Sequence, residues 1–237
     1  MSAQSVAPRS RQTRPVDSDD AVISRALEFS NWARANIRMI IIGAVLAAVV
    51  VGGLLWWRYD RAQRLERAAA EFQMVEQQVA TGNIPLVQQE LARFVTRFSG
   101  TPYADEAALL LGQLHLQAGN TQQAIDVLRE PASRIRRGNM GAQAAMLLAA
   151  AQQAGGDIAG AEATYLRVAN EAEMTFRQQE ALNAAAALRE EAGNLAGAAE
   201  LYGRLAQMSE TGSTDRAVFE MRQAEVLAQA QQQVPAN

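Results

Sequence analysis

The longest uninterrupted apolar stretch of the chain runs from Met39 to Trp57, nineteen uncharged residues bounded by Arg38 and Arg58. A helix of this length rises about 28 Å, which is close to the thickness of the hydrocarbon core of a bilayer. The stretch is apolar on all sides, whereas a helix at the surface of a soluble core is apolar on one side only. We therefore predict a single transmembrane helix over residues 37–58.

Aromatic residues lie at both ends of this stretch, as is typical of membrane interfaces. The predicted interface anchors are Trp32, Trp56, Trp57 and Tyr59. A cleavable signal peptide is the alternative, but its apolar core is about 7 to 15 residues long and small residues follow it. Bulky Trp56-Trp57-Arg58 stands here instead, which favours an uncleaved signal anchor. Arginine counts on the two flanks are similar, so charge alone does not set the orientation.

Small residues recur at helical spacing within the predicted span. They are Gly43, Ala44, Ala47, Ala48 and Gly52. Such a stripe lets a second helix approach closely inside lipid, so it is a candidate surface for helix packing. Chance occurrence in an alanine-rich chain is the alternative.

The segments that flank the span differ in pattern. Residues 1–20 are polar and contain two prolines, which predicts a disordered tail. Apolar positions at helical spacing over residues 21–36, with Asp20 as a candidate N-cap, predict a short interfacial helix. No Pro or Gly occurs between Arg58 and Thr81, so we expect the membrane helix to continue into a helical domain over residues 59–237.

Four two-residue turn signals follow at a constant period of 37 residues. They are Gly82-Asn83, Gly119-Asn120, Gly156-Asp157 and Gly193-Asn194. A fixed period of this length is typical of helical repeat arrays. Each Gly is expected to end a helix in the left-handed conformation, and the Asn or Asp after it is expected to cap the next helix.

The positions after each glycine follow a second pattern. A small residue stands five positions on, at Val87, Ala124, Ala161 and Ala198, and a large one nine positions on, at Leu91, Leu128, Tyr165 and Tyr202. The small residues suit close helix contact, and the large ones lie one turn further along the same side of the helix. Each unit therefore reads as a helix, a tight turn and a second helix.

On these residues the chain resembles the tetratricopeptide repeat family, whose unit has a glycine turn, a small residue and a large residue at these offsets. The resemblance implies an all-α fold, in which the transmembrane helix precedes an α-solenoid of about four helix pairs. The expected repeats are residues 66–98, 103–137, 140–171 and 174–208, with a capping helix at 214–233. The period is 37 rather than about 34, the first helices lack the usual Trp and Tyr, and Pro131 is expected to interrupt the second helix of the second repeat.

A signal anchor followed by an alanine-rich repeat array resembles the YfgM-type ancillary subunits of the bacterial Sec translocon. That resemblance implies an inner-membrane protein with a cytoplasmic N-terminus and a periplasmic repeat domain, which associates with chaperones and membrane machinery. A permanent structural subunit of a large respiratory or photosynthetic complex is the alternative. In both interpretations the protein is a scaffold, and its expected partners are a membrane protein complex, periplasmic proteins and the lipid bilayer.

The resemblance also implies a binding groove, because the first helix of each pair lines the inner face of such arrays. Its members here are expected to be Phe72, Glu76, Glu106, Leu109, Gln113, Gln143, Met146, Gln153, Glu180, Asn183 and Glu190. This face is acidic and rich in amides, and the Lys- and Arg-lined clamp that some members use for carboxylates is absent. A basic segment is the expected ligand, and a merely solvated groove is the alternative.

Composition changes this picture mainly by exclusion. All 22 basic residues are Arg and there is no Cys, so lysine and cysteine chemistry is absent. The single histidine, His115, leaves no multi-histidine metal site, and we expect it to pack in the core. Glu190-Glu191 and Asp19-Asp20 are pairs in sequence only, so they are expected to be solvated. We expect neither an enzyme nor a cofactor.

Charge is distributed unevenly along the chain. Residues 82–237 carry twelve Arg against seventeen acidic residues, so this part of the chain is not expected to bind nucleic acid. One basic patch stands out, formed by Arg129, Arg134, Arg136 and Arg137. Anionic lipid or an acidic partner is one interpretation of it, and ordinary solvated surface is the other.

Overall fold

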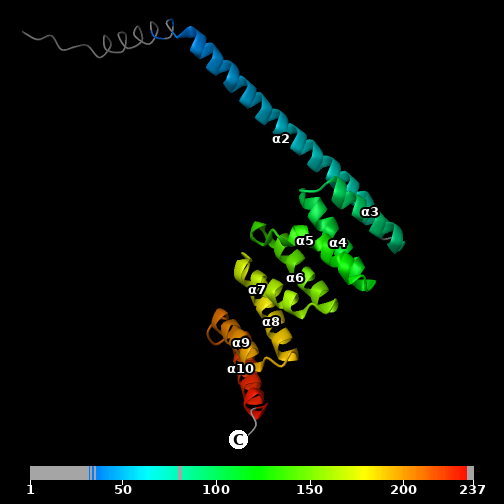
Figure 1. Ribbon diagram of the computed structural model, residues 1–237, viewed down its shortest axis with the longest axis vertical. Coiled ribbons are helices and arrows are strands. Elements are labelled where there is room, and N and C mark those ends of the chain that lie inside the picture. Colours follow the sequence, from blue (N-terminus) through cyan, green and yellow to red (C-terminus); the bar gives the residue numbers. More distant parts are fainter. Residues whose placement is uncertain (1–31, 33, 35, 80–81, 234–237) are drawn as a thin grey trace, which may run out of the picture. The chain divides into compact units, whose positions relative to one another are not determined.

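The computed structural model of the protein describes residues 32, 34, 36–79 and 82–233. The tail expected at 1–20, with Asp19 and Asp20, and most of the helix expected at 21–36 lie outside these residues. All regular structure within the described residues is helical (Figure 1). The helices are α2 (Ile37–Val79), α3 (Ile84–Arg97), α4 (Pro102–Gln117), α5 (Thr121–Ala132), the 3₁₀ helix η1 (Ile135–Arg137), α6 (Asn139–Ala154), α7 (Ile158–Glu171), α8 (Thr175–Glu191), α9 (Leu195–Met208) and α10 (Thr214–Gln233).

The chain divides into two compact units, Met1–Arg61 and Ala62–Asn237. The described part of the first unit is the apolar part of α2, whose side chains are exposed along its whole length. Val49, for example, is 67% exposed and Trp56 is 70% exposed. By its length and composition this helix is a candidate membrane span.

The glycine turns of the second unit have the geometry that the period predicts. Gly82, Gly119, Gly156 and Gly193 all have φ between 75° and 85°, in the left-handed region that side chains disfavour. The next residue then caps the following helix in three of the four turns. The side chains of Asn83, Asp157 and Asn194 accept hydrogen bonds from the backbone N–H groups of Leu86, Gly160 and Gly197.

The helices of the second unit stack in chain order, each from α3 to α10 packing against the next. Helix α6 also contacts α4 and α8, the helices two positions before and after it. This is the arrangement of an α-solenoid, in which each repeat buries its apolar face against its neighbours.

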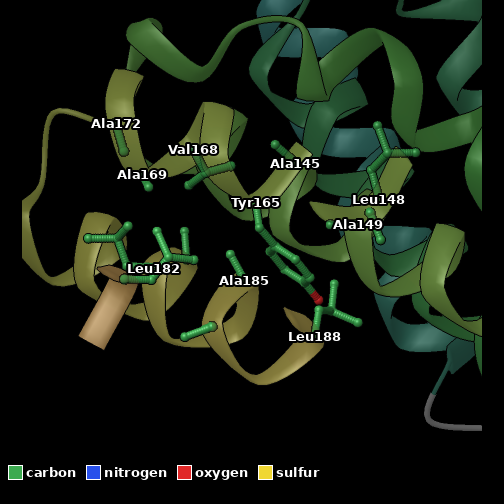
Figure 2. Close-up of a cluster of buried hydrophobic side chains, with 14 of the residues drawn as sticks. Ala145, Leu148, Ala149, Tyr165, Val168, Ala169, Ala172, Leu182, Ala185 and Leu188 are labelled. Atoms are coloured by element: carbon green, nitrogen blue, oxygen red, sulfur yellow. The ribbon is translucent and has the colours of Figure 1, made fainter. Parts of the chain in front are cut away.

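The core of the solenoid consists of two clusters. The smaller one joins Phe72 of α2 to α3 and α4, with the rings of Phe72 and Phe94 5.6 Å apart. The larger one extends from α4 to α10. Figure 2 shows the side chain of Tyr165 between Ala149 on α6 and Ala185 and Leu188 on α8.

Burial at the repeat offsets agrees with the sequence pattern. All four small residues, Val87, Ala124, Ala161 and Ala198, are fully buried. The large residues four positions later are buried as well, and Leu91 and Leu128 have no exposed surface. The prediction of close helix contacts at these positions is therefore confirmed.

The expected interruption at Pro131 takes a particular form. Pro131 does not stop α5 at the preceding residue but lies inside its last turn, and the helix ends one residue later at Ala132. The backbone then forms η1 (Ile135–Arg137) and turns at Gly138, whose φ is 108°. The second helix of this repeat is therefore split in two, because the proline ring cannot continue the helical hydrogen bonding.

Candidate partner-binding groove

Helices α2, α4 and α6 bring six of the expected groove residues together around one hollow of about 250 Å³. We call it the α2–α4–α6 hollow. It is lined by Phe72, Glu76, Glu106, Leu109, Leu110, Gln113, Met140 and Gln143. Leu110 and Met140 were not predicted from the sequence, although Leu110 follows Leu109 directly and Met140 lies one helical turn before Gln143.

The lining residues divide into a floor and a rim. Phe72 is 5% exposed and Leu109 is 6% exposed, and each belongs to one of the two core clusters, so they form the floor rather than projecting into a groove. Glu76, Glu106 and Gln113 are exposed and form the rim. The hollow therefore combines an apolar base with polar, acidic edges.

The rim carboxylates differ from the other expected groove carboxylates in their partners. In the described part of the chain, neither Glu76 nor Glu106 forms an ion pair or a side-chain hydrogen bond. Glu180, in contrast, lies 2.6 Å from a guanidinium nitrogen of Arg177. Two carboxylates without a partner among the described residues thus stand at the rim of the α2–α4–α6 hollow.

Glu190 belongs to a second hollow, of about 510 Å³, between α8, α9 and α10. It accepts a hydrogen bond from the Tyr202 hydroxyl at 3.0 Å, and its two carboxylate oxygens lie 2.8 and 3.0 Å from the Arg222 guanidinium. Arg222 also bonds Glu225 on its own helix at 2.7 Å. Burial raises the pKa of Tyr202, so its hydroxyl stays protonated and donates to Glu190. Glu190 therefore ties α10 to α8.

The remaining expected groove residues line neither of these hollows. Met146 is half-buried and packs against the larger core cluster, and Gln153 is half-buried at the end of α6. Glu180 and Asn183 are exposed on α8. The structure thus brings the members on α2, α4 and the first half of α6 together and leaves the others dispersed.

The arginines of the expected basic patch are largely paired within the chain. Arg134 lies 2.5 Å from Asp105 and 2.9 Å from Glu130. Arg129 and Arg136 each lie 3.4 Å from an acidic side chain, Asp126 and Glu171 respectively. Burial raises the pKa of Asp105 even though Arg134 lies beside it. The pairing favours ordinary protein surface over a lipid-binding patch.

His115 is half-buried on α4, and its Nδ1 atom is buried without a hydrogen-bond partner. Burial lowers the pKa of this imidazole. Among the residues that the structure describes, no group of three or more His, Asp or Glu side chains could hold a metal ion. His115 therefore has the surroundings of a packing residue.

The predicted membrane residues are exposed in the first unit. Around the glycines of the small-residue stripe, Gly43 and Gly52, a Cβ atom would meet nothing within 4 Å. Ala44, Ala47 and Ala48 are exposed beside them, as are the anchors Trp32, Trp56, Trp57 and Tyr59. The Arg61 guanidinium lies 5.5 Å from the ring centre of Trp57 and so lies against one of the predicted anchors.

Comparison with solved structures agrees with the solenoid. The structure is similar to crystallised TPR-like repeats ascribed to a kinesin light chain of Podosopora anserina, with 16% identity and a TM-score of 0.52, over 70% of this chain and 88% of that one. It is also similar to a tetratricopeptide repeat protein from Parabacteroides merdae, with 15% identity and a TM-score of 0.52, over 70% of this chain and 62% of that one. At these identities the likeness concerns the fold alone.

Sequence comparison identifies the family. No curated protein matches the chain. The family model described as a tetratricopeptide repeat-like domain matches residues 30–164, more than half of the chain, and this match begins ahead of the apolar part of α2. Members of such repeat families typically act as non-enzymatic scaffolds for protein–protein interaction. The chain therefore belongs to the tetratricopeptide repeat-like family.

Proposed function

We propose that the protein is a membrane-anchored scaffold of the bacterial inner membrane, whose periplasmic repeat domain assists or stabilises a membrane protein complex. The observation that carries the proposal is the family match over residues 30–164, which takes in both the exposed apolar part of α2 and the first repeats. An apolar helix long enough to span a membrane and the first repeats thus lie within one family match, which supports the proposal. The YfgM-type translocon and chaperone accessories, which the chain resembles in architecture, are the proposed class.

One observation favours a more permanent association. The stripe from Gly43 to Gly52 is exposed, and it offers a surface on which another membrane helix can pack closely. A structural subunit of a large respiratory or photosynthetic complex would use such a surface throughout its life. This is the second candidate function.

Anchoring and orientation are tested with the full chain in its host membrane. Because the chain has no Cys, single cysteines at Ser5 and Ser213 report the side of the membrane through a thiol reagent that cannot cross it. We expect labelling from the periplasmic side at Ser213→Cys only. Val49→Arg places a charge in the apolar part of α2 and is expected to release the protein from membranes, at a cost of about 2–4 kcal/mol.

The scaffold role is tested by extraction with a mild detergent and identification of the proteins that co-purify. Ala48→Leu with Gly52→Leu fills the stripe, and Gly53→Leu, which makes the same kind of change on a different side of the helix, is the matched control. If the first variant loses a membrane partner and the control retains it, the result supports association through the stripe. If the wild-type chain brings down no membrane or periplasmic protein, the scaffold proposal is wrong.

A further inference from the structure

The α2–α4–α6 hollow has a chemistry that defines what it can hold. Its volume of about 250 Å³ lies below the roughly 300–1,000 Å³ of small-molecule pockets, so it suits one or two side chains better than a whole ligand. Phe72 and Leu109 supply an apolar floor, and Glu76 and Glu106 stand at the rim. An occupant therefore needs an apolar stem and a positive end.

The charges at the hollow have no counterpart among the residues that the structure describes. Neither Arg nor His is among its lining residues. Carboxylates such as Glu71, Asp105 and Glu162 lie within 3 Å of an arginine. Glu76 and Glu106 have no such partner among the described residues, and unlike other unpaired carboxylates such as Glu200 they border a hollow with an apolar floor, where they are open to a cation from outside.

The rim also carries amide groups. Gln113 and Gln143 line the same hollow, and no described side chain forms a hydrogen bond with either. Their Oε1 atoms can accept from an N–H donor, and so can the carboxylates. A guanidinium offers five N–H donors in one plane and matches this set better than an ammonium, which has three.

We propose that the α2–α4–α6 hollow receives an arginine side chain from a basic, partly apolar segment of a partner protein. The arginine stem lies on Phe72 and Leu109, its guanidinium pairs with Glu76 and Glu106, and an apolar neighbour in the segment contacts Leu110 and Met140. Anionic groups such as phosphates are repelled. The proposal rests on the scaffold function and names the partner's chemistry.

The test uses the full chain in nanodiscs of phosphatidylcholine, which carries no net charge. The probe is a library of acetylated nonapeptides with random flanks around a fixed Leu-Arg-Leu, and an otherwise identical library carries citrulline, the neutral isostere of arginine. Peptides that bind are identified by mass spectrometry, and the best is made in both forms. We expect the arginine form to bind about fivefold or more tightly at 50 mM salt, with the difference shrinking at 300 mM.

Two variants locate the effect. Glu76→Gln with Glu106→Gln is expected to abolish the difference between the arginine and citrulline peptides. Glu200→Gln with Glu210→Gln removes the same charge from two exposed carboxylates outside the hollow and is expected to preserve it. All four side chains are exposed, so folding is expected to survive, and circular dichroism confirms it for each variant.

Two outcomes would overturn the proposal. They are equal affinity for the two peptide forms and an equal loss in both variant pairs. If peptide selectivity fails while partners still co-purify, the scaffold function stands without this site. If selectivity holds and nothing co-purifies, the scaffold function fails instead.

Discussion

Replacement of Gly141 by alanine tests the packing of the split second repeat. Gly141 is buried in the first turn of α6. A Cβ atom placed there would lie 2.2 Å from the carbonyl oxygen of Arg134 and 3.0 Å from the backbone nitrogen of Ile135. Both contacts are with backbone, which cannot rotate aside as a side chain can.

The magnitude follows from two opposing effects. Alanine is favoured over glycine within a helix by about 1 kcal/mol. An ordinary carbon–oxygen contact is about 3.4 Å, so the chain at Arg134 and Ile135 must withdraw by about 1 Å, and overpacking of this kind costs about 1–3 kcal/mol or more. The shift also disturbs the ion pair between Arg134 and Asp105. We expect a net loss of about 2 kcal/mol and a melting temperature lower by about 4–8 °C.

Gly203→Ala is the matched control, since it makes the same change inside α9. The Cβ there would lie 2.7 Å from the side-chain amide nitrogen of Gln223. This nitrogen is at the end of a flexible side chain, which can move aside. We expect its melting temperature to equal that of the wild type or to exceed it slightly.

The assay is thermal unfolding of the full chain in detergent, followed by circular dichroism at 222 nm, with hydrogen exchange to locate the change. Faster exchange is expected in peptides that cover η1 and the start of α6. If Gly141→Ala melts at or above the wild-type temperature, or behaves like Gly203→Ala, the inferred backbone contact is wrong.

Three further predictions concern the core, the lone histidine and the terminal helix. Leu128→Ala, at a fully buried position, is expected to lower the free energy of unfolding by about 2–5 kcal/mol in denaturant titrations. Burial lowers the pKa of His115 below its usual 6.5, so the folded state disfavours the imidazolium. Folding stability is therefore expected to fall as the pH drops through 6.5. His115→Gln cannot be protonated, so it is expected to lose less stability than the wild type between pH 7.5 and 5. Arg222→Ala releases Glu190 and is expected to cost about 1 kcal/mol and to speed hydrogen exchange in α10, whereas Arg216→Ala, whose ion partner lies on α10 itself, is expected to leave the attachment to α8 unchanged. Equal exchange in the two variants would argue against the tie.

The features that the sequence predicted best are those in which the local backbone dictates the residue. A turn with positive φ selects glycine, so Gly119 and its counterparts marked the turns without any knowledge of the tertiary structure. The small residue at Ala124 and the large one at Leu128 then followed, because residues four apart share a helix face.

The features that the sequence did not predict depend on side chains that are distant in the chain. Glu190 and Arg222 are 32 residues apart, and Asp105 and Arg134 are 29 apart, so nothing local signals that either pair meets. Both pairs neutralise charge that the sequence left open for a ligand. Glu76 and Glu106 are also acidic but have no such partner among the described residues, a distinction that only the packed structure reveals.

The division of the core into two clusters has a mechanical consequence. Helix α4 contributes Ala107 and Leu111 to the smaller cluster and Leu109 to the larger, and half-buried Val127 of α5 packs against both. A pull on the N-terminal end of the chain therefore loads the smaller cluster first, which holds far fewer side chains than the other. The first repeat is thus the part of the solenoid that is held by the smaller core. Force applied to the N-terminal end is therefore expected to unfold the first repeat while the later repeats stay folded.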